Sequence, residues 1–354
     1  MSKHKMAGVA FGKFMFCMLL ITDRKANRTW FLIWLLLLAF VGYAQQKQER
    51  DNAGVIKLNT NLVSFNATVL SKKTGKIITG LRKEDFILFD EGVRQEITHF
   101  TNDEHPLSVI ILIDDSGSVR SILDEIHDEG RQTLRNLKPE DEIALMAFSS
   151  TAWLVWDFTL SKKEIIERIA PEKLFPLIGV DNIDFSGSGT HIADSIYLAA
   201  KHFDKATNPP GRRSIIVITD DWANDTIYSE EEVTNQLFES GVTVYGLIIG
   251  GRHIFDRYII PMSFGKNGGN ATTYANKTGG VALNGRGNKA AENLTRIISL
   301  LRQQYSFGYV PTNSQMDGKF RKINLKVTPE IEKREGRVTI LTRQGYYARP
   351  RNAR

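Results

Sequence analysis

Side chains with hard oxygen atoms occur at three places in the sequence. The first group is Asp114, Ser116 and Ser118, which directly follows an apolar stretch. Thr190 ends a Gly-rich run, and Asp220 follows a second apolar stretch. If the two apolar stretches are neighbouring parallel strands, their carboxyl ends lie at one edge of a sheet, where ligands bind in such folds. The sequence therefore predicts that these three groups form one site.

Carboxylate and hydroxyl oxygens of this kind are suitable ligands for Mg²⁺, which prefers octahedral geometry and retains bound water. With two or three hydroxyls on the ion and the carboxylates acting partly through water, the ion keeps excess positive charge. An open coordination position would then attract an external carboxylate. This is binding chemistry that requires no nucleophile, so no catalytic residue is predicted. Mg²⁺ is the favoured ion, with Mn²⁺ and Ca²⁺ as alternatives.

The pattern resembles the metal-ion-dependent adhesion site of von Willebrand factor type A domains. The shared features are D-x-S-x-S from Asp114 to Ser118, Thr190 in a Gly-rich loop before a helix, and Asp220 after an apolar strand. The flanking sequences at 79–100, 317–327 and 343–348 resemble the bacterial exported group called acidobacterial VWFA-related proteins, so the resemblance covers residues 55–348.

This resemblance implies a metal site made of Asp114, Ser116, Ser118, Thr190 and Asp220. The serines and the threonine would bind the ion directly, and the aspartates often act through water. The implied partner is a protein that supplies an Asp or Glu carboxylate. One position departs from the family, which usually has Gly where this chain has Asp221. The side chain of Asp221 is expected either to add negative charge near the ion or to face solvent.

Strand and helix patterns alternate after Pro106. Leu107–Ile113, Ser214–Thr219 and Val242–Ile249 are almost continuously apolar, which is typical of buried parallel strands. Thr190–Phe203 and Asn288–Gln304 carry apolar residues at helical spacing. The alternation predicts an α/β fold with a doubly wound, mostly parallel, Rossmann-like sheet.

Two segments of β pattern flank this α/β region, and neither is long enough for a comfortable core of its own. We therefore predict that they pack together as one β-sandwich into which the α/β domain is inserted. The expected organisation is a signal peptide (1–44), a linker (45–54), an N-terminal β segment (55–105), the α/β domain (106–304), a C-terminal β segment (305–348) and a tail (349–354).

The N-terminal residues have the order of a secretory signal. Arg24, Lys25 and Arg28 precede the unbroken apolar run Trp30–Phe40, and small residues follow at Gly42 and Ala44. The run is short for a membrane span, so none is predicted in the mature chain. The sequence thus predicts export to the periplasm or the extracellular space. An uncleaved N-terminal anchor is the alternative.

Charge and cysteine content exclude several function classes. The net charge is +6, but residues 1–44 contribute six basic side chains and one acidic one, which leaves the rest of the chain at +1. A nucleic-acid partner is therefore not expected. Cys17 is the single cysteine. Disulfide frameworks, cysteine zinc sites and cysteine nucleophiles are thus excluded from the remainder.

Two regions are expected to border the predicted site and to contact a partner. Trp222 follows Asp220 closely, and packing against its own loop is the alternative for its side chain. The segment Gly250–Thr273 is long for a connection between elements, and a small buried helix is the alternative there. The candidate contact residues are Trp222, Arg252, Phe255, Tyr258, Met262 and Phe264.

The favoured hypothesis is an exported adhesion or interaction module that binds a partner's Asp or Glu through a Mg²⁺-type ion. A metal-dependent hydrolase using Asp114 or Ser116 is the second hypothesis. The sequence has no G-x-S-x-G, H-E-x-x-H or P-loop pattern to support it. The third hypothesis is a structural or assembly component of the envelope.

Overall fold

The computed structural model describes residues 62–102, 105–115, 134, 137–169, 189–208, 212–223, 226–249, 270–285 and 289–349. All of them lie in Asn61–Arg354, the second of the two compact units into which the chain divides. The predicted signal peptide and linker lie outside the described residues. Of the helices that are described, none combines the length and apolar character needed to cross a membrane.

The α/β region is built on a six-stranded sheet with the strand order β10-β9-β8-β5-β6-β7. Five of the strands run parallel, and the edge strand β7 is antiparallel to β6. This arrangement confirms the predicted mostly parallel sheet. The strands are β5 (Ser108–Asp114), β6 (Glu142–Phe148), β7 (Ala152–Thr159), β8 (Arg213–Thr219), β9 (Val242–Ile248) and β10 (Ala282–Asn284).

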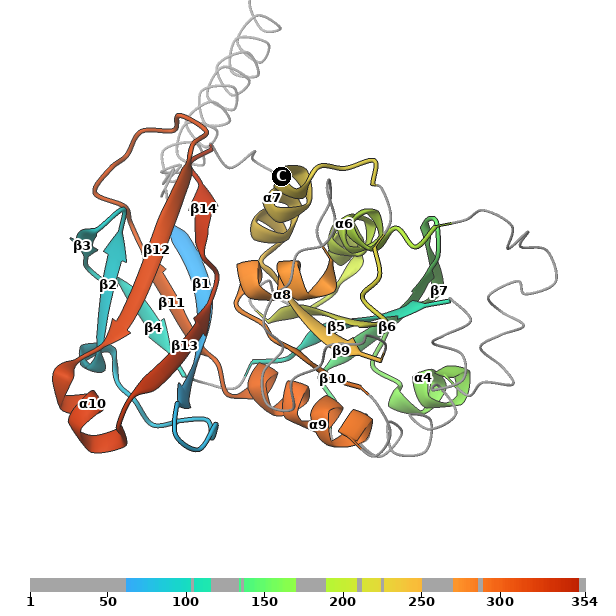
Figure 1. Cartoon of the computed structure of the whole chain (residues 1–354), viewed down its shortest axis with the longest axis horizontal. Helices are drawn as coiled ribbons and strands as arrows, with labels where there is room; N and C mark the ends of the chain where they lie inside the picture. Colours follow the sequence, from blue (N-terminus) through green and yellow to red (C-terminus); the bar gives the residue numbers. More distant parts are fainter. Residues whose placement is uncertain are drawn as a thin grey trace, which may run out of the picture. The chain divides into compact units, whose positions relative to one another are not determined.

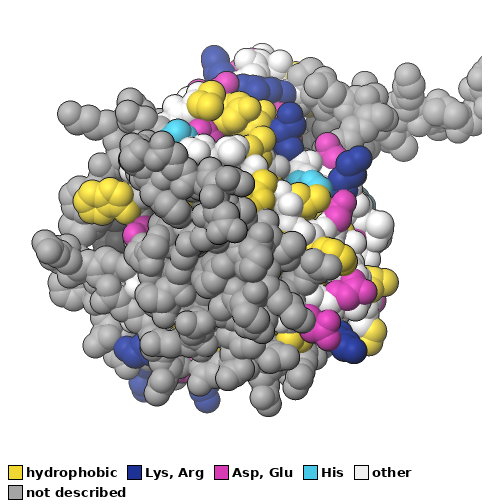
Figure 2. All heavy atoms as spheres, turned by 90° about the vertical axis from the view of Figure 1, so that its right-hand side faces the viewer, with side chains coloured by type: hydrophobic (Ala, Val, Ile, Leu, Met, Phe, Trp, Pro, Cys, Tyr) yellow, Lys and Arg dark blue, Asp and Glu magenta, His cyan; other side chains and the backbone are white. Residues whose placement is uncertain are grey.

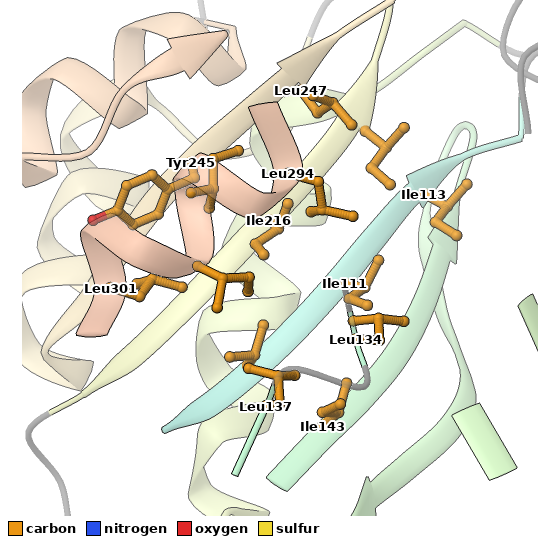
Figure 3. Close-up of a cluster of buried hydrophobic side chains, with 14 of the residues drawn as sticks. Ile111, Ile113, Leu134, Leu137, Ile143, Ile216, Tyr245, Leu247, Leu294 and Leu301 are labelled. Atoms are coloured by element: carbon orange, nitrogen blue, oxygen red, sulfur yellow. The ribbon is translucent and has the colours of Figure 1, made fainter. Parts of the chain in front are cut away.

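Helices cover both faces of this sheet. As a result, every residue of β5, β6, β8 and β9 is buried. In Figure 1, α6, α7 and α8 lie on one face and α4 and α9 on the other. Successive residues of β5 belong to the two cores. Ile111 and Ile113 lie in the same cluster as residues of α9 (Figure 3), whereas Ile110 and Leu112 lie in the cluster that includes α6. The helices are α4 (Lys162–Ile169), α6 (Ile192–His202), α7 (Glu230–Ser240), α8 (Ala271–Thr278) and α9 (Lys289–Arg302). A short 3₁₀ helix, η3 (Phe203–Lys205), follows α6.

The flanking segments form two four-stranded antiparallel sheets, with the orders β13-β1-β11-β4 and β14-β12-β2-β3. Each sheet combines strands from both ends of the described chain. The strands are β1 (Val63–Ser71), β2 (Phe86–Asp90), β3 (Val93–Gln95), β4 (His99–Thr101), β11 (Tyr305–Tyr309), β12 (Phe320–Val327), β13 (Val338–Thr342) and β14 (Gly345–Tyr347). Two short helices, η2 (Lys83–Asp85) and α10 (Pro329–Glu335), connect them.

One aromatic core joins the two sheets. Phe86 from the first segment contacts Tyr305 and Phe307 from the last segment, with ring centroids 5.3 and 5.0 Å apart. Burial alternates along the whole of β12, as expected for a strand with one face on a core. The predicted single β-sandwich is therefore confirmed.

From its sequence, Gln95–Phe100 is expected to form one strand, and the structure differs from this expectation. The chain forms β3 and β4 there instead, and the two strands belong to different sheets. The sequence Asp90-Glu91-Gly92 is typical of a hairpin turn, and this turn is present between β2 and β3, with positive φ at Glu91 (49°) and Gly92 (81°), as a tight two-residue hairpin requires.

Candidate functional site

Asp114 is the last residue of β5 and is fully buried, with 0% of its surface exposed. It lies beside Phe148 of β6, and the next backbone N–H, that of Asp115, donates to the carbonyl of Phe148 at 2.8 Å. On the other side, the Thr219 hydroxyl donates to Asp114 Oδ2 at 2.7 Å. The carboxylate is thus held between the carboxyl ends of β6 and β8.

Thr190 is half-buried and lies just before α6. The N–H of the next residue, His191, donates to the carbonyl of Ser149 at 2.9 Å. Because Ser149 directly follows β6, this bond places the Thr190 turn at the same edge of the sheet as Asp114.

Asp220 follows the last residue of β8, and Ile218 in that strand is aligned with Ile113 in β5. Asp220 Oδ1 accepts a hydrogen bond from the N–H of Trp222 at 3.1 Å. This local bond closes a tight turn that fixes the aspartate side chain. The structure thus brings Asp114, Thr190 and Asp220 to one edge, whereas Ser116 and Ser118 lie outside the described residues.

The structure contradicts one of the two roles expected for Asp221, that of facing solvent, whereas its effect on an ion stays a prediction. Its Oδ1 accepts from the N–H of Ala271 at 2.8 Å and its Oδ2 from the Thr272 hydroxyl at 2.5 Å, so the carboxylate caps the start of α8. Burial, with a smaller contribution from the charge of Asp220, raises the pKa of Asp221 to about 6 against these hydrogen bonds. The side chain is therefore engaged with a helix and does not face solvent.

A second buried carboxylate, that of Asp194, binds the loop between β8 and α7. Asp194, in the first turn of α6, accepts from the N–H groups of Ile227 and Tyr228 at 3.0 Å. His191 Nδ1 lies 3.4 Å from Asp194 Oδ2. Sequence reasoning did not single out Asp194. Its acidic position in a first helical turn was the available signal.

Trp222 and Ile227 project from this braced loop with 78% and 80% of their surface exposed. Trp222 was a predicted partner contact, and its exposure excludes the alternative that it packs against its own loop. Ile227 was not predicted. The remaining candidate contacts lie outside the described residues, namely Arg252, Phe255, Tyr258, Met262 and Phe264. Figure 2 shows exposed hydrophobic side chains among charged ones on the described part of one face of the molecule.

The described donor set fits a hard divalent cation. It consists of the oxygens of Asp114, Thr190 and Asp220, two carboxylates and one hydroxyl, which suit Mg²⁺, Mn²⁺ or Ca²⁺. Within the described ranges, no group of three or more His, Cys, Asp or Glu side chains is placed to hold a metal.

Comparison with known proteins gives one family match. The model of the von Willebrand factor type A domain matches residues 108–278, from β5 to the end of α8. No curated protein matches the chain.

Solved structures of low sequence identity also match. Proximal thread matrix protein 1 from the mussel byssus is 17% identical with a TM-score of 0.40, over 56% of this chain and 48% of that one. The matched region thus spans about half of the mussel protein. Another structure of that protein has a zinc-occupied MIDAS motif. An aerotolerance-related membrane protein from Bacteroides fragilis is 19% identical with a TM-score of 0.39, over 55% of this chain and 98% of that one.

Proposed function

Because residues 108–278 form a von Willebrand factor type A domain, we propose that this protein is an exported interaction module that captures a carboxylate of a protein partner through a bound divalent cation. In this proposal the ion is bound by five residues, which are Asp114, Ser116, Ser118, Thr190 and Asp220. The ion, with Mg²⁺ favoured, would supply an open coordination position for the partner's Asp or Glu. Domains of this family are generally interaction modules.

The observation that carries the proposal is the convergence of Asp114, Thr190 and Asp220 at the carboxyl ends of β5, β6 and β8. Asp114 is buried and is oriented by the Thr219 hydroxyl. Burying a carboxylate is costly unless it is paired, and a cation at the sheet edge would offset that cost. The half-buried Thr190 and Asp220 supply oxygens nearer to solvent, where a partner can approach.

Export is part of the same proposal. The apolar run Trp30–Phe40 after three basic residues supports it, and so does the lack of cysteine beyond Cys17. Partner contact at the site is supported by two exposed side chains, Trp222 next to the Asp220 turn and Ile227 on the loop that Asp194 holds.

The test is calorimetric titration of Mg²⁺ and Mn²⁺ into the chain starting at Gln45, beside its Asp114→Ala variant. We expect binding by the parent and none by the variant. The matched control is Glu239→Ala, which removes an exposed carboxylate from α7 and is expected to bind like the parent. A folded parent that binds neither ion, or an Asp114→Ala variant that binds as tightly as the parent, would refute the proposal.

A further inference from the structure

We propose that Asp221 is a positioning residue that fixes the Asp220 turn by joining it to α8, and that the β13–β14 turn of the sandwich holds α8 from its other end. The sandwich would thereby take part in shaping the site. This inference rests on the proposed function only for its consequence on cation affinity. The coupling itself can be measured without any ion.

The backbone of Asp221 indicates that its side chain is needed at this position. Its φ is 63°, in the left-handed region that is unfavourable for residues other than Gly, Asn and Asp. Gly would adopt this conformation readily but would offer no acceptor to α8. The carboxylate supplies two, for Ala271 N–H and for the Thr272 hydroxyl.

Asp221 is also connected to the interior of the site. Its N–H donates to Thr219 Oγ1 at 3.1 Å, and the same hydroxyl donates to Asp114. Asp221 thus lies between Asp114 and α8, and its neighbour Asp220 is the predicted metal residue. A shift of the α8 N-terminus would move Asp221 and the turn that carries Asp220.

The other end of α8 is in close contact with the sandwich. Gln344 N–H donates to the carbonyl of Lys277 at 3.0 Å. Gly279, the C-cap with φ 84°, lies so near β13 that a Cβ there would be 2.5 Å from Thr342 Cα and 2.8 Å from Arg343 N. The helix has only eight residues and is therefore about 12 Å long, so a tilt at one end is carried directly to the other.

The α/β domain holds the same end of α8 as well. Val244 N–H in β9 donates to the Thr278 hydroxyl at 2.9 Å. The C-terminus of α8 is therefore fixed between β9 and the β13–β14 turn, and its N-terminus is fixed by Asp221. Arg343 of the same turn also stacks on Phe238 of α7, 4.1 Å from the ring centroid. The turn thus contacts both helices that follow β8 and β9.

Gly279→Ala and Gly241→Ala form a matched pair for testing this coupling. Both place alanine at a helix C-cap with positive φ, 84° and 67°, so both carry a similar backbone penalty. A Cβ at Gly241 meets nothing within 4 Å, whereas at Gly279 it collides with the sandwich turn. Asp221→Gly removes the link at the other end while keeping a compatible backbone. Asp221→Asn tolerates the same φ and keeps an acceptor for Ala271 N–H.

The readout is amide hydrogen exchange of the peptide covering residues 219–223, measured without metal in the chain starting at Gln45. We expect exchange to rise about tenfold in Asp221→Gly and in Gly279→Ala. Gly241→Ala should remain within about twofold of the parent, and Asp221→Asn should recover most of the protection. In a second arm, the Mg²⁺ dissociation constant should rise about tenfold in Asp221→Gly and in Gly279→Ala, and only in these two variants.

The two arms separate this inference from the proposed function. A parent that binds no Mg²⁺ but shows the expected exchange pattern refutes the proposed function and supports the coupling. Unchanged exchange in Gly279→Ala, or equal changes in Gly279→Ala and Gly241→Ala, would overturn the coupling whether or not the ion binds.

Discussion

At the scale of single residues, the Thr219 hydroxyl is the connection on which the candidate site depends. It donates to Asp114 Oδ2 at 2.7 Å and accepts from Asp221 N–H at 3.1 Å. One hydroxyl can do both, because it has one donor and two lone pairs. Thr219 is fully buried, so water does not readily replace these bonds.

Thr219→Val is therefore expected to destabilise the fold. Valine has nearly the same shape but cannot donate to Asp114 or accept from Asp221. The loss of both bonds at a buried position costs about 1–3 kcal/mol in the free energy of unfolding. Urea denaturation followed by circular dichroism measures this directly. Thr219→Ser keeps the hydroxyl and should lose less than about 1 kcal/mol. Because Thr219→Val keeps the methyl group and Thr219→Ser keeps the hydroxyl, equal losses in the two variants would contradict a dominant role of the hydroxyl.

The location of Asp114, Thr190 and Asp220 at one edge could be predicted because strand order fixes where parallel strands end. Their role as metal ligands stays a prediction. The function of Asp221 could not be predicted in the same way, since its partners Ala271 and Thr272 are fifty residues away in the sequence. Nothing local to Asp221 indicates which helix it caps.

At the scale of elements, long apolar strands were predictable and short elements were not. The strands β5, β8 and β9 are mostly apolar, and all of their residues are buried. In contrast, α8 has the sequence ATTYANKT, whose Thr and Asn residues are poor helix formers. Capping by Asn270 and Asp221, and packing of the buried Tyr274, stabilise it instead. The start of α8 consequently lies inside Gly250–Thr273, the long connection expected to border the site, for which a small buried helix was the alternative.

The opposite end of the sheet is held by an ionised group at the start of β6. Glu142 Oε1 accepts from the Ser108 hydroxyl and from Asn208 N–H, at 2.7 and 2.9 Å. Its Oε2 accepts from the Thr207 hydroxyl and N–H, at 2.7 and 3.0 Å. Burial raises the pKa of Glu142, but these hydrogen bonds outweigh it and hold the pKa below the ordinary 4.5. The carboxylate therefore joins β5, β6 and the segment after α6.

Glu142→Gln should destabilise the protein in a pH-dependent way. An amide has one acceptor oxygen, so donors on one side would face its NH₂ group, at a cost of about 1–3 kcal/mol at neutral pH. Because the folded pKa is lower than the unfolded one, the stabilisation is complete above the unfolded value. It is lost as pH falls through the folded value. The difference in unfolding free energy between parent and variant should therefore shrink below pH 4.5.

The control for this prediction is Glu140→Gln, an exposed neighbour whose removal of one charge should leave stability within about 0.5 kcal/mol. Thermal unfolding of the three proteins across the acid range measures the effect. A difference between parent and Glu142→Gln that stays constant with pH would show that ionisation of Glu142 does not contribute.

At the scale of the whole molecule, the sandwich cannot form from one end of the described chain. Both neighbours of β1, which are β11 and β13, come from the C-terminal segment. The same is true of β12, the neighbour of β2. The need of each β segment for a shared core made this pairing predictable. The division of one predicted strand into β3 and β4 was not, because it depends on which sheet edge is vacant.

Truncation after Gln304 should therefore unfold the N-terminal β segment and leave the α/β region folded. The shortened chain keeps every described strand and helix of that region, since α9 ends at Arg302. It loses β11–β14, so Phe65 and Phe86 lose the aromatic partners that bury them. Burying such side chains is worth about 1.5–3 kcal/mol each. The strands β1–β4 alone cannot replace that contribution. In the truncated chain β1 lacks its neighbours β11 and β13, and β2 lacks its neighbour β12.

Limited proteolysis with mass spectrometry distinguishes the outcomes. In chains starting at Gln45, we expect rapid cleavage within residues 62–102 of the truncated protein, while fragments covering β5 to α9 persist. A chain ending at Arg349 keeps all four C-terminal strands and should protect both regions. Protection of residues 62–102 in the truncated protein would show that the N-terminal strands hold their own core. Cleavage throughout would show that the α/β region needs the sandwich in order to fold. That second result would extend to the whole domain the support that the β13–β14 turn gives to α8.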